Sequence, residues 1–205
     1  VSVRGQVPAV AFFSRSGWQH ALMGGYWVFT TVVLLLGALA FAVRTGRWVP
    51  GHLRVNDHAP EHDPPPANLE QMDAWVAETE ARQANLVPGA EARITWANPA
   101  RKARTPVAFL YLHGFSASRQ ESAPVSARLA GAYEANLFEA RIAGHGCGPE
   151  ALGKATARDW LCSAQQAWDV AAELGERVVI VAMSNGASLA TWLLRESANR
   201  DKTLA

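Results

Sequence analysis

The chain has 205 residues, of which 49% are hydrophobic and 18% are charged, and its formal net charge is +1. A chain of this size can bury one sizeable core and carry an appendage. The near-neutral charge argues against a nucleic-acid partner, which needs a strongly basic face, so we predict no nucleic-acid binding. The two cysteines, Cys147 and Cys162, are too few and too far apart for a disulfide framework or a zinc site.

A long apolar segment dominates the N-terminal part of the chain. No charged residue occurs between positions 16 and 43, and residues 21–43 are apolar almost throughout. As a helix, residues 21–43 would be about 34 Å long, enough to cross a hydrocarbon core of roughly 30 Å. We therefore predict a flank over residues 1–20 and a transmembrane helix over residues 21–43. The arginines on its two sides nearly balance, which leaves both orientations open.

A cleaved signal peptide is the alternative interpretation of this segment. Ala38-Leu39-Ala40 has the small-x-small form of a cleavage site. The apolar run and the region before it are long for a signal peptide, which favours a retained anchor.

Residues 44–67 connect the apolar segment to the rest of the chain. Their second half is polar, acidic and rich in proline, and the prolines at positions 64–66 favour an extended backbone. His58 and His62 lie among acidic residues, but the flanking prolines disfavour a helix that would bring them together, so we predict no metal site. We interpret residues 44–67 as a tether and residues 68–205 as a folded domain.

Helix and strand patterns alternate after the tether. The expected helices cover residues 68–86, 122–133 and 156–174, and the expected strands cover residues 91–96, 107–112, 136–142 and 178–181. Thr156 and Asp159 have capping-box spacing at the start of the third helix. This alternation predicts an α/β fold with a mainly parallel sheet flanked by helices.

Ser184 stands where the last expected strand passes into a helix rich in small residues. The strand leads directly into Ala182-Met183-Ser184-Asn185-Gly186. This strand–turn–helix layout is typical of a nucleophile elbow, whose sharp turn exposes a serine at the top of a sheet. Such a turn requires small residues two positions before and two positions after the serine, and Ala182 and Gly186 meet this requirement. The alternative interpretation of Ser184 is an ordinary helix N-cap.

A second motif, His113-Gly114-Phe115, directly follows the expected buried strand. The glycine lets the backbone bend so that the next amides face a cavity. The backbone N–H groups of Phe115 and Asn185 could then stabilise the oxyanion of an acyl-transfer reaction. We interpret His113 as a structural histidine bonded to the backbone. His145, which lies between two glycines, is an alternative candidate for a catalytic base.

Residues 148–154 have the spacing of a phosphate-binding loop up to its lysine. Ala155 stands where such a loop needs a hydroxyl to hold magnesium, and Pro149 removes an amide that phosphates would use. We therefore predict neither a nucleotide nor any other cofactor.

Four motifs occur in the order found in α/β-hydrolases. They are LHGF at residues 112–115, RIAGHG at residues 141–146, Thr156 with Asp159-Trp160, and the turn at Ser184. Over residues 90–195 the chain resembles this superfamily, and in particular its bacterial carboxylesterase and monoacylglycerol-lipase-like branch. The resemblance implies Ser184 as nucleophile and the amides of Phe115 and Asn185 as oxyanion hole. The chain departs from the family pattern at Ala182, where glycine is customary.

In that family an acid and a histidine follow the nucleophile, whereas no histidine follows Ser184 in this chain. We therefore expect the front part of a membrane-anchored serine hydrolase, with an α/β-hydrolase domain over residues 68–205 that is incomplete at its C-terminus. The triad acid and histidine would lie beyond residue 205. The expected reaction is cleavage of a carboxylic ester through a Ser184 acyl-enzyme.

The expected substrate is a small, hydrophobic ester, and the resemblance to bacterial proteins implies a location in the inner membrane. The alternative is a catalytically inert, membrane-tethered module of the same fold. A sheet that ended after the elbow helix would leave an apolar edge strand unpaired. This consideration favours the incomplete enzyme.

Overall fold

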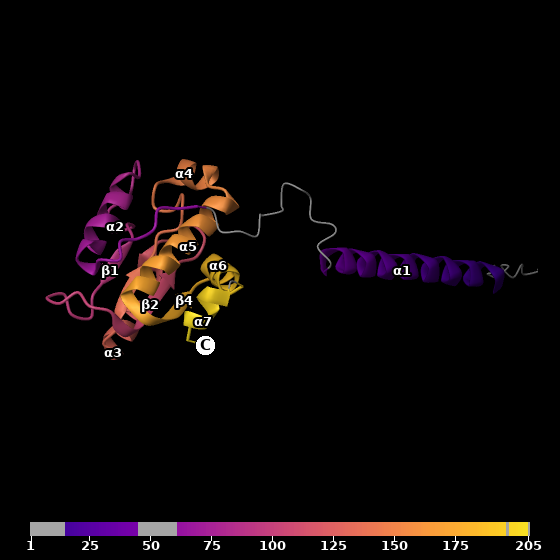
Figure 1. The fold of residues 1–205 in the computed structure, drawn as a ribbon. Helices are drawn as coiled ribbons and strands as arrows, with labels where there is room; N and C mark the ends of the chain where they lie inside the picture. Colours follow the sequence, from indigo (N-terminus) through magenta and orange to yellow (C-terminus); the bar gives the residue numbers. More distant parts are fainter. Residues whose placement is uncertain (1–14, 45–60, 196, 205) are drawn as a thin grey trace, which may run out of the picture. The chain divides into compact units, whose positions relative to one another are not determined.

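The computed structural model describes residues 15–44, 61–195 and 197–204, with side chains omitted at positions 15–28, 43, 197 and 198. The chain divides into two compact units, Val1–Arg54 and Val55–Ala205. In Figure 1 the helix of the first unit is indigo, and the second unit runs from magenta to yellow.

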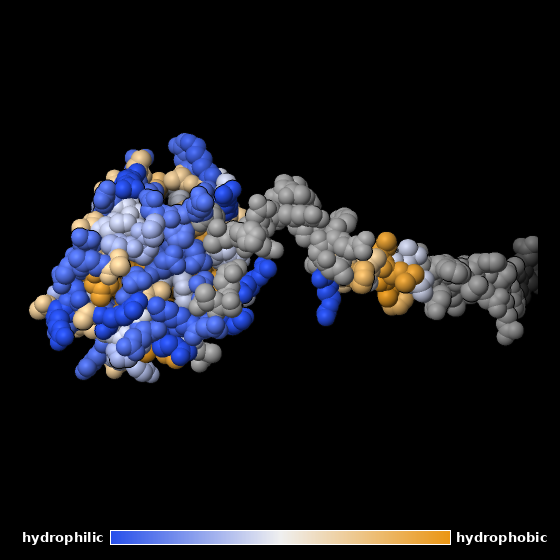
Figure 2. All heavy atoms as spheres, in the orientation of Figure 1, coloured by the Kyte–Doolittle hydropathy of each residue, from blue (hydrophilic) through white to orange (hydrophobic). Residues whose placement is uncertain are grey.

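The first unit contains one long helix, α1 (Arg15–Arg44). The segment predicted to span a membrane, residues 21–43, lies within this helix, which begins before the expected boundary at residue 20. Large apolar side chains of its described part are exposed, among them Phe29, Leu34 and Phe41 (Figure 2). Within the described residues, no helix combines the length and the hydropathy that a membrane span requires. Residues 1–14 of the predicted flank lie outside the described residues.

The second unit is built on a four-stranded sheet in the order β1-β3-β2-β4. The strands are β1 (Arg93–Thr95), β2 (Thr105–Leu112), β3 (Asn136–Glu139) and β4 (Gly175–Ala182). Strand β2 pairs in parallel with both β3 and β4, and β1 pairs antiparallel with β3 at the edge. The predicted α/β fold with a mainly parallel sheet is therefore confirmed.

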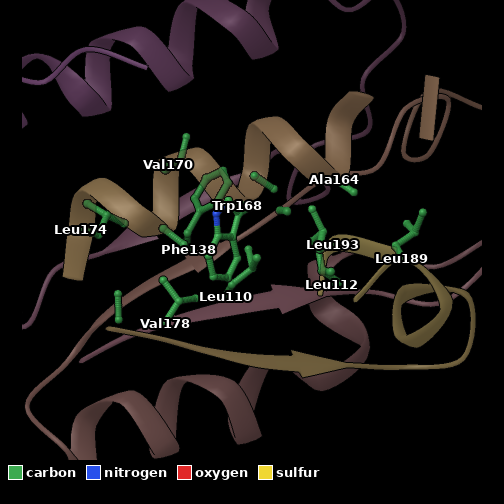
Figure 3. Close-up of a cluster of buried hydrophobic side chains, with 14 of the residues drawn as sticks. Leu110, Leu112, Phe138, Ala164, Trp168, Val170, Leu174, Val178, Leu189 and Leu193 are labelled. Carbon is green, nitrogen blue, oxygen red and sulfur yellow. The ribbon is translucent and has the colours of Figure 1, made fainter. Parts of the chain in front are cut away.

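Helices cover both faces of the sheet (Figures 1 and 3). Helices α2 (Met72–Ala81), α5 (Ala157–Leu174) and α6 (Asn185–Leu193) pack on one face, and α3 (Ala123–Ala132) packs on the other. Along β2 the side chains alternate between the two layers, because successive residues of a strand point to opposite faces. Leu110 and Leu112 face α5 and its neighbours, whereas Phe109 and Tyr111 face α3.

Several elements differ from the sequence expectation in their bounds. The helix expected over residues 68–86 is a short 3-10 turn, η2 (Leu69–Gln71), followed by α2, which ends at Ala81. The strand expected over residues 136–142 ends at Glu139 because the chain turns into a glycine-containing loop there. The capping box of α5 is confirmed, since Thr156 and Asp159 bond to each other's backbone N–H.

Three short helical elements have no counterpart among the expected ones. They are η3 (Arg119–Ser122), α4 (Pro149–Lys154) and α7 (Ser197–Lys202). Helix α4 occupies most of the segment with phosphate-loop spacing, and the residues leading into it form a loop, not a strand. After α7, Thr203 forms a parallel bridge with Val178 of β4.

The end of the predicted tether packs against α5. The His62 Nε2 atom lies 2.6 Å from the Asp169 carboxylate, and the Gln166 side chain donates a 3.3 Å hydrogen bond to the Asp63 carbonyl. Residues 62 and 63, within the predicted tether, thus bond to the folded unit. The described residues contain no cluster of metal-ligand side chains, and His58 lies outside them.

Candidate active site

Ser184 lies in a sharp turn between the end of β4 and the start of α6. Its backbone angles are φ 45° and ψ −110°, a conformation that residues with a side chain rarely adopt. The chain passes from strand to helix in two residues, Met183 and Ser184, and the Ser184 side chain is exposed and caps no helix N–H. This is the backbone arrangement of a nucleophile elbow.

Gly186 permits a close approach between α6 and the end of β2. A Cβ atom added at Gly186 would clash with the Leu112 carbonyl oxygen and would lie 2.8 Å from the His113 carbonyl oxygen. The same Leu112 carbonyl accepts a 3.0 Å hydrogen bond from the Met183 N–H. Because of this contact, the turn at Ser184 lies beside the loop that begins at His113. Ala182, the last residue of β4, packs half-buried against the core below.

His113 is buried, and both of its ring nitrogens bond to the backbone. The Ile142 N–H donates to His113 Nε2 at 3.1 Å, so the proton resides on Nδ1, which donates to the Gly114 carbonyl at 2.9 Å. Burial lowers the pKa of His113 to about 4, against an ordinary value of 6.5. His113 is therefore a neutral ring that joins the loop after β2 to the loop after β3.

The two amides expected to bind an oxyanion are both available. Among the described residues, the backbone N–H groups of Phe115 and Asn185 donate no hydrogen bond. The Gly114 carbonyl accepts from His113 Nδ1 and from the Ala117 N–H at 3.3 Å. Since a trans peptide directs its N–H opposite to its C=O, the Phe115 N–H faces away from these partners. Asn185 opens α6, where the first amides of a helix lack internal acceptors and attract negative charge.

His145 does not contact the candidate nucleophile through a hydrogen bond. Its Nδ1 atom lies 3.2 Å and 3.1 Å from the carbonyls of Ile142 and Ala143, and its Nε2 atom is buried without a partner in the described part of the chain. Burial lowers the pKa of His145. Its ring packs edge-on against those of His113 and Phe115. The described residues offer no histidine that hydrogen-bonds to Ser184.

One residue near the site carries a contact that the sequence did not indicate. Glu121, in η3, accepts the Gly114 N–H at 2.8 Å through Oε2. Arg119, two residues before it, bonds to the Glu91 carbonyl at 2.9 Å. An isolated surface glutamate has no sequence signature, because only the fold of the loop after β2 brings Gly114 within its reach.

A hollow of about 280 Å³ lies between the loop after β2 and the loop that contains His145. It is lined by Ser116, Gly144, His145, Gly146, Gly148, Pro149 and Leu152. The positive φ angles of Gly144, Gly146 and Gly148 shape this wall. Ser184 does not line this hollow.

Comparison with known proteins gives partial likenesses only. No protein-family model and no curated protein matches the sequence. Among solved structures, the chain is similar to one from work on LipS and LipT, two metagenome-derived lipolytic enzymes. The identity is 25% and the TM-score 0.46, and the match covers 53% of this chain and 41% of that one. It is also similar to an arylesterase, with 20% identity and a TM-score of 0.32 over 66% of this chain and 50% of that one. The chain thus spans half or less of each neighbour's length, and the interpretation of the site rests on its own geometry.

Replacing Gly186 by alanine is expected to lower the free energy of unfolding by about 1–3 kcal/mol, because overpacking a rigid contact forces the backbone to shift. The added Cβ would lie 2.7 Å from the carbonyl carbon of Leu112. Chemical denaturation followed by tryptophan fluorescence measures the change. The control is Gly131→Ala in α3, where nothing lies within 4 Å of the added atom. This variant is expected to gain about 0.5–1 kcal/mol, and equal stability of the two variants would contradict the contact.

Acid is expected to destabilise the folded unit through its buried histidines. As the pH falls below 6.5, the unfolded chain binds a proton at position 113 before the folded protein does, because the folded pKa is about 4. The free energy of unfolding should therefore be constant above about pH 6.5 and fall by up to about 3 kcal/mol towards pH 4. The lowered pKa of His145 acts in the same direction. Denaturant titrations across this range should give a shallower fall for His113→Asn, and identical pH profiles would refute the assignment.

Proposed function

We propose that the folded unit is an α/β-hydrolase-type domain and that Ser184 is the nucleophile of a serine hydrolase acting on carboxylic esters. One observation carries the proposal. The unpaired N–H groups of Phe115 and Asn185 come from the two loops that meet beside Ser184, whose own backbone is held at positive φ. An unpaired N–H is ordinary at the start of a helix, but two unpaired N–H groups from separate loops beside an exposed serine suit a developing oxyanion.

In the proposed reaction, the Ser184 hydroxyl oxygen attacks the ester carbonyl and its proton passes to a base. The carbonyl oxygen becomes an oxyanion that accepts hydrogen bonds from Phe115 and Asn185. Each such donor typically contributes about 3–4 kcal/mol to the stability of the transition state. The tetrahedral intermediate collapses, the ester C–O bond breaks, and the base returns its proton to the leaving alcohol. Water then hydrolyses the acyl-enzyme that remains. The base is assigned to no described residue.

Apolar side chains beside the site support a hydrophobic ester as the substrate. Phe115 is 58% exposed and Met183 is 46% exposed, although both are large and apolar. Phe115 precedes the hollow at Ser116, and Met183 directly precedes the nucleophile. An acyl or alcohol group that covered these side chains would remove apolar surface from water, which is favourable at about 25 cal/mol per Å².

We further propose that α1 anchors the chain in a membrane. Its described residues 29–42 expose apolar side chains all round, which a soluble helix does not do. The run includes Val32, Val33, Leu34, Leu35, Leu36 and Leu39, each more than two-fifths exposed. Lipid is the solvent that such a surface requires.

An inert, membrane-tethered module is the second candidate, favoured by one observation. In the described part of the chain, Ser184 has no hydrogen-bonded histidine, and His113 and His145 are buried with lowered pKa values. A serine without a base is a weak nucleophile. Reactivity of Ser184 towards an active-site probe decides between the two candidates.

A fluorophosphonate probe is expected to label Ser184 of the protein in membranes from cells that produce it. Attack on phosphorus needs an activated serine and places the phosphoryl oxygen on the two amides. Mass spectrometry of the labelled peptide identifies the site, and Ser184→Ala should abolish labelling. The control Ser188→Ala changes an exposed serine of α6 and should label normally. If the wild-type protein resists labelling while folded, the inert module is the better interpretation.

The chain is expected to stay in the membrane pellet during alkaline carbonate extraction and to dissolve in detergent. Replacing Leu34 and Leu35 by lysine should release it, because a lysine at the centre of a span costs about 2.5–3.5 kcal/mol. The control carries two lysines at exposed positions of the folded unit, Val125→Lys and Tyr133→Lys. This variant should stay in the membrane pellet. Release of the wild-type chain by carbonate alone would refute the anchor.

A further inference from the structure

We propose that Glu121 is a positioning residue for the oxyanion hole, acting through the Gly114 peptide. The inference rests on the proposed function and assigns a role to a side chain that touches neither Ser184 nor a reacting atom. Glu121 would set the direction of the Phe115 N–H.

The first support is the hydrogen bond from the Gly114 N–H to Glu121 Oε2, at 2.8 Å. The carbonyl of the same residue is held by His113 Nδ1 at 2.9 Å. Gly114 is therefore fixed on both sides, by a carboxylate at its N–H and by an imidazole at its C=O. The Phe115 N–H belongs to the same planar, trans peptide as the Gly114 carbonyl and points away from it, so the bonds at both ends of Gly114 fix its direction.

The second support is the way in which Glu121 itself is held. The Tyr111 hydroxyl donates to the same Oε2 atom at 3.0 Å. Burial raises the pKa of Tyr111 to about 12, so the phenol keeps the proton that it donates. Arg119, two residues before Glu121, is buried and tied to the Glu91 carbonyl. A carboxylate fixed in this way can hold a loop, whereas a freely rotating surface glutamate cannot.

The third support is the space left for the carboxylate. A Cβ atom added at Gly114 would lie 3.0 Å from Glu121 Oε1, which is tighter than ordinary van der Waals contact. Because Gly114 has no side chain, the Glu121 carboxylate can approach it closely and the backbone can bend there. A bond between an ionised acceptor and a backbone N–H is also stronger than a neutral one.

The test is the kinetics of Ser184 labelling by a fluorophosphonate in the full chain. Glu121→Ala should lower the maximal labelling rate by about 10- to 100-fold. A displaced Phe115 N–H would lose its hydrogen bond to the oxyanion, and that bond forms only in the transition state. The probe concentration at half-maximal rate should stay within about threefold, since ground-state binding does not use the oxyanion hole. Glu121→Gln, which keeps an acceptor oxygen, should recover most of the lost rate.

Glu78→Ala is the matched control, because it removes a surface glutamate that pairs with Arg82 on α2, outside the site. It should label as the wild-type protein does. Wild-type kinetics in a folded Glu121→Ala variant would overturn the inference alone. A wild-type protein that is not labelled at all would overturn the proposed function, and this inference with it.

A second measurement covers the case in which Glu121→Ala fails to fold. Amide hydrogen exchange of the wild-type chain, read by NMR, should show Gly114 protected and Phe115 exchanging rapidly. Rapid exchange at Gly114 would overturn the inference without any variant, because it would mean that the bond to Glu121 does not persist in solution.

Discussion

The contact between the first turn of α6 and the carboxyl end of β2 governs the geometry of the candidate site. Leu112 binds the Met183 N–H through its carbonyl, and Gly186 lies so close to that carbonyl that no side chain fits between them. The chain must therefore leave β4 and enter α6 within two residues, which forces Ser184 to a positive φ. The same contact brings the unpaired amide of Asn185 beside the loop that carries Phe115. The positions of Ser184 and of the two unpaired amides are thus consequences of one packing constraint.

Hydrogen bonds to the backbone hold the loop after β2 in place. His113 spans from Gly114 to Ile142, and Glu121 accepts the remaining Gly114 N–H. These hydrogen bonds hold the loop without help from any other molecule. The lowered pKa of His113 belongs to the same arrangement, because a protonated ring could not accept the Ile142 N–H. The loop therefore depends on a buried, neutral histidine, which becomes protonated in acid.

The two units of the chain differ in where their apolar side chains lie. In the folded unit, apolar side chains lie between the sheet and the helices on each face. The described part of α1 exposes its apolar side chains instead. Within the predicted tether, His62 and Asp63 bond to α5 of the folded unit.

The local signals of the sequence were sufficient for the fold and for part of the site. Hydrophobic periodicity predicted the alternating strands and helices, the Thr156–Asp159 spacing predicted the start of α5, and small residues around Ser184 predicted the sharp turn. Each of these depends on neighbours in sequence, and so can be read without a fold. Only the tertiary structure decided the antiparallel pairing of β1 with β3, the early end of α2, the contact of Gly186 with Leu112 and the bond from Gly114 to Glu121. They depend on which segments distant in sequence come into contact, and hydrogen bonds across such contacts leave no periodic trace in the chain.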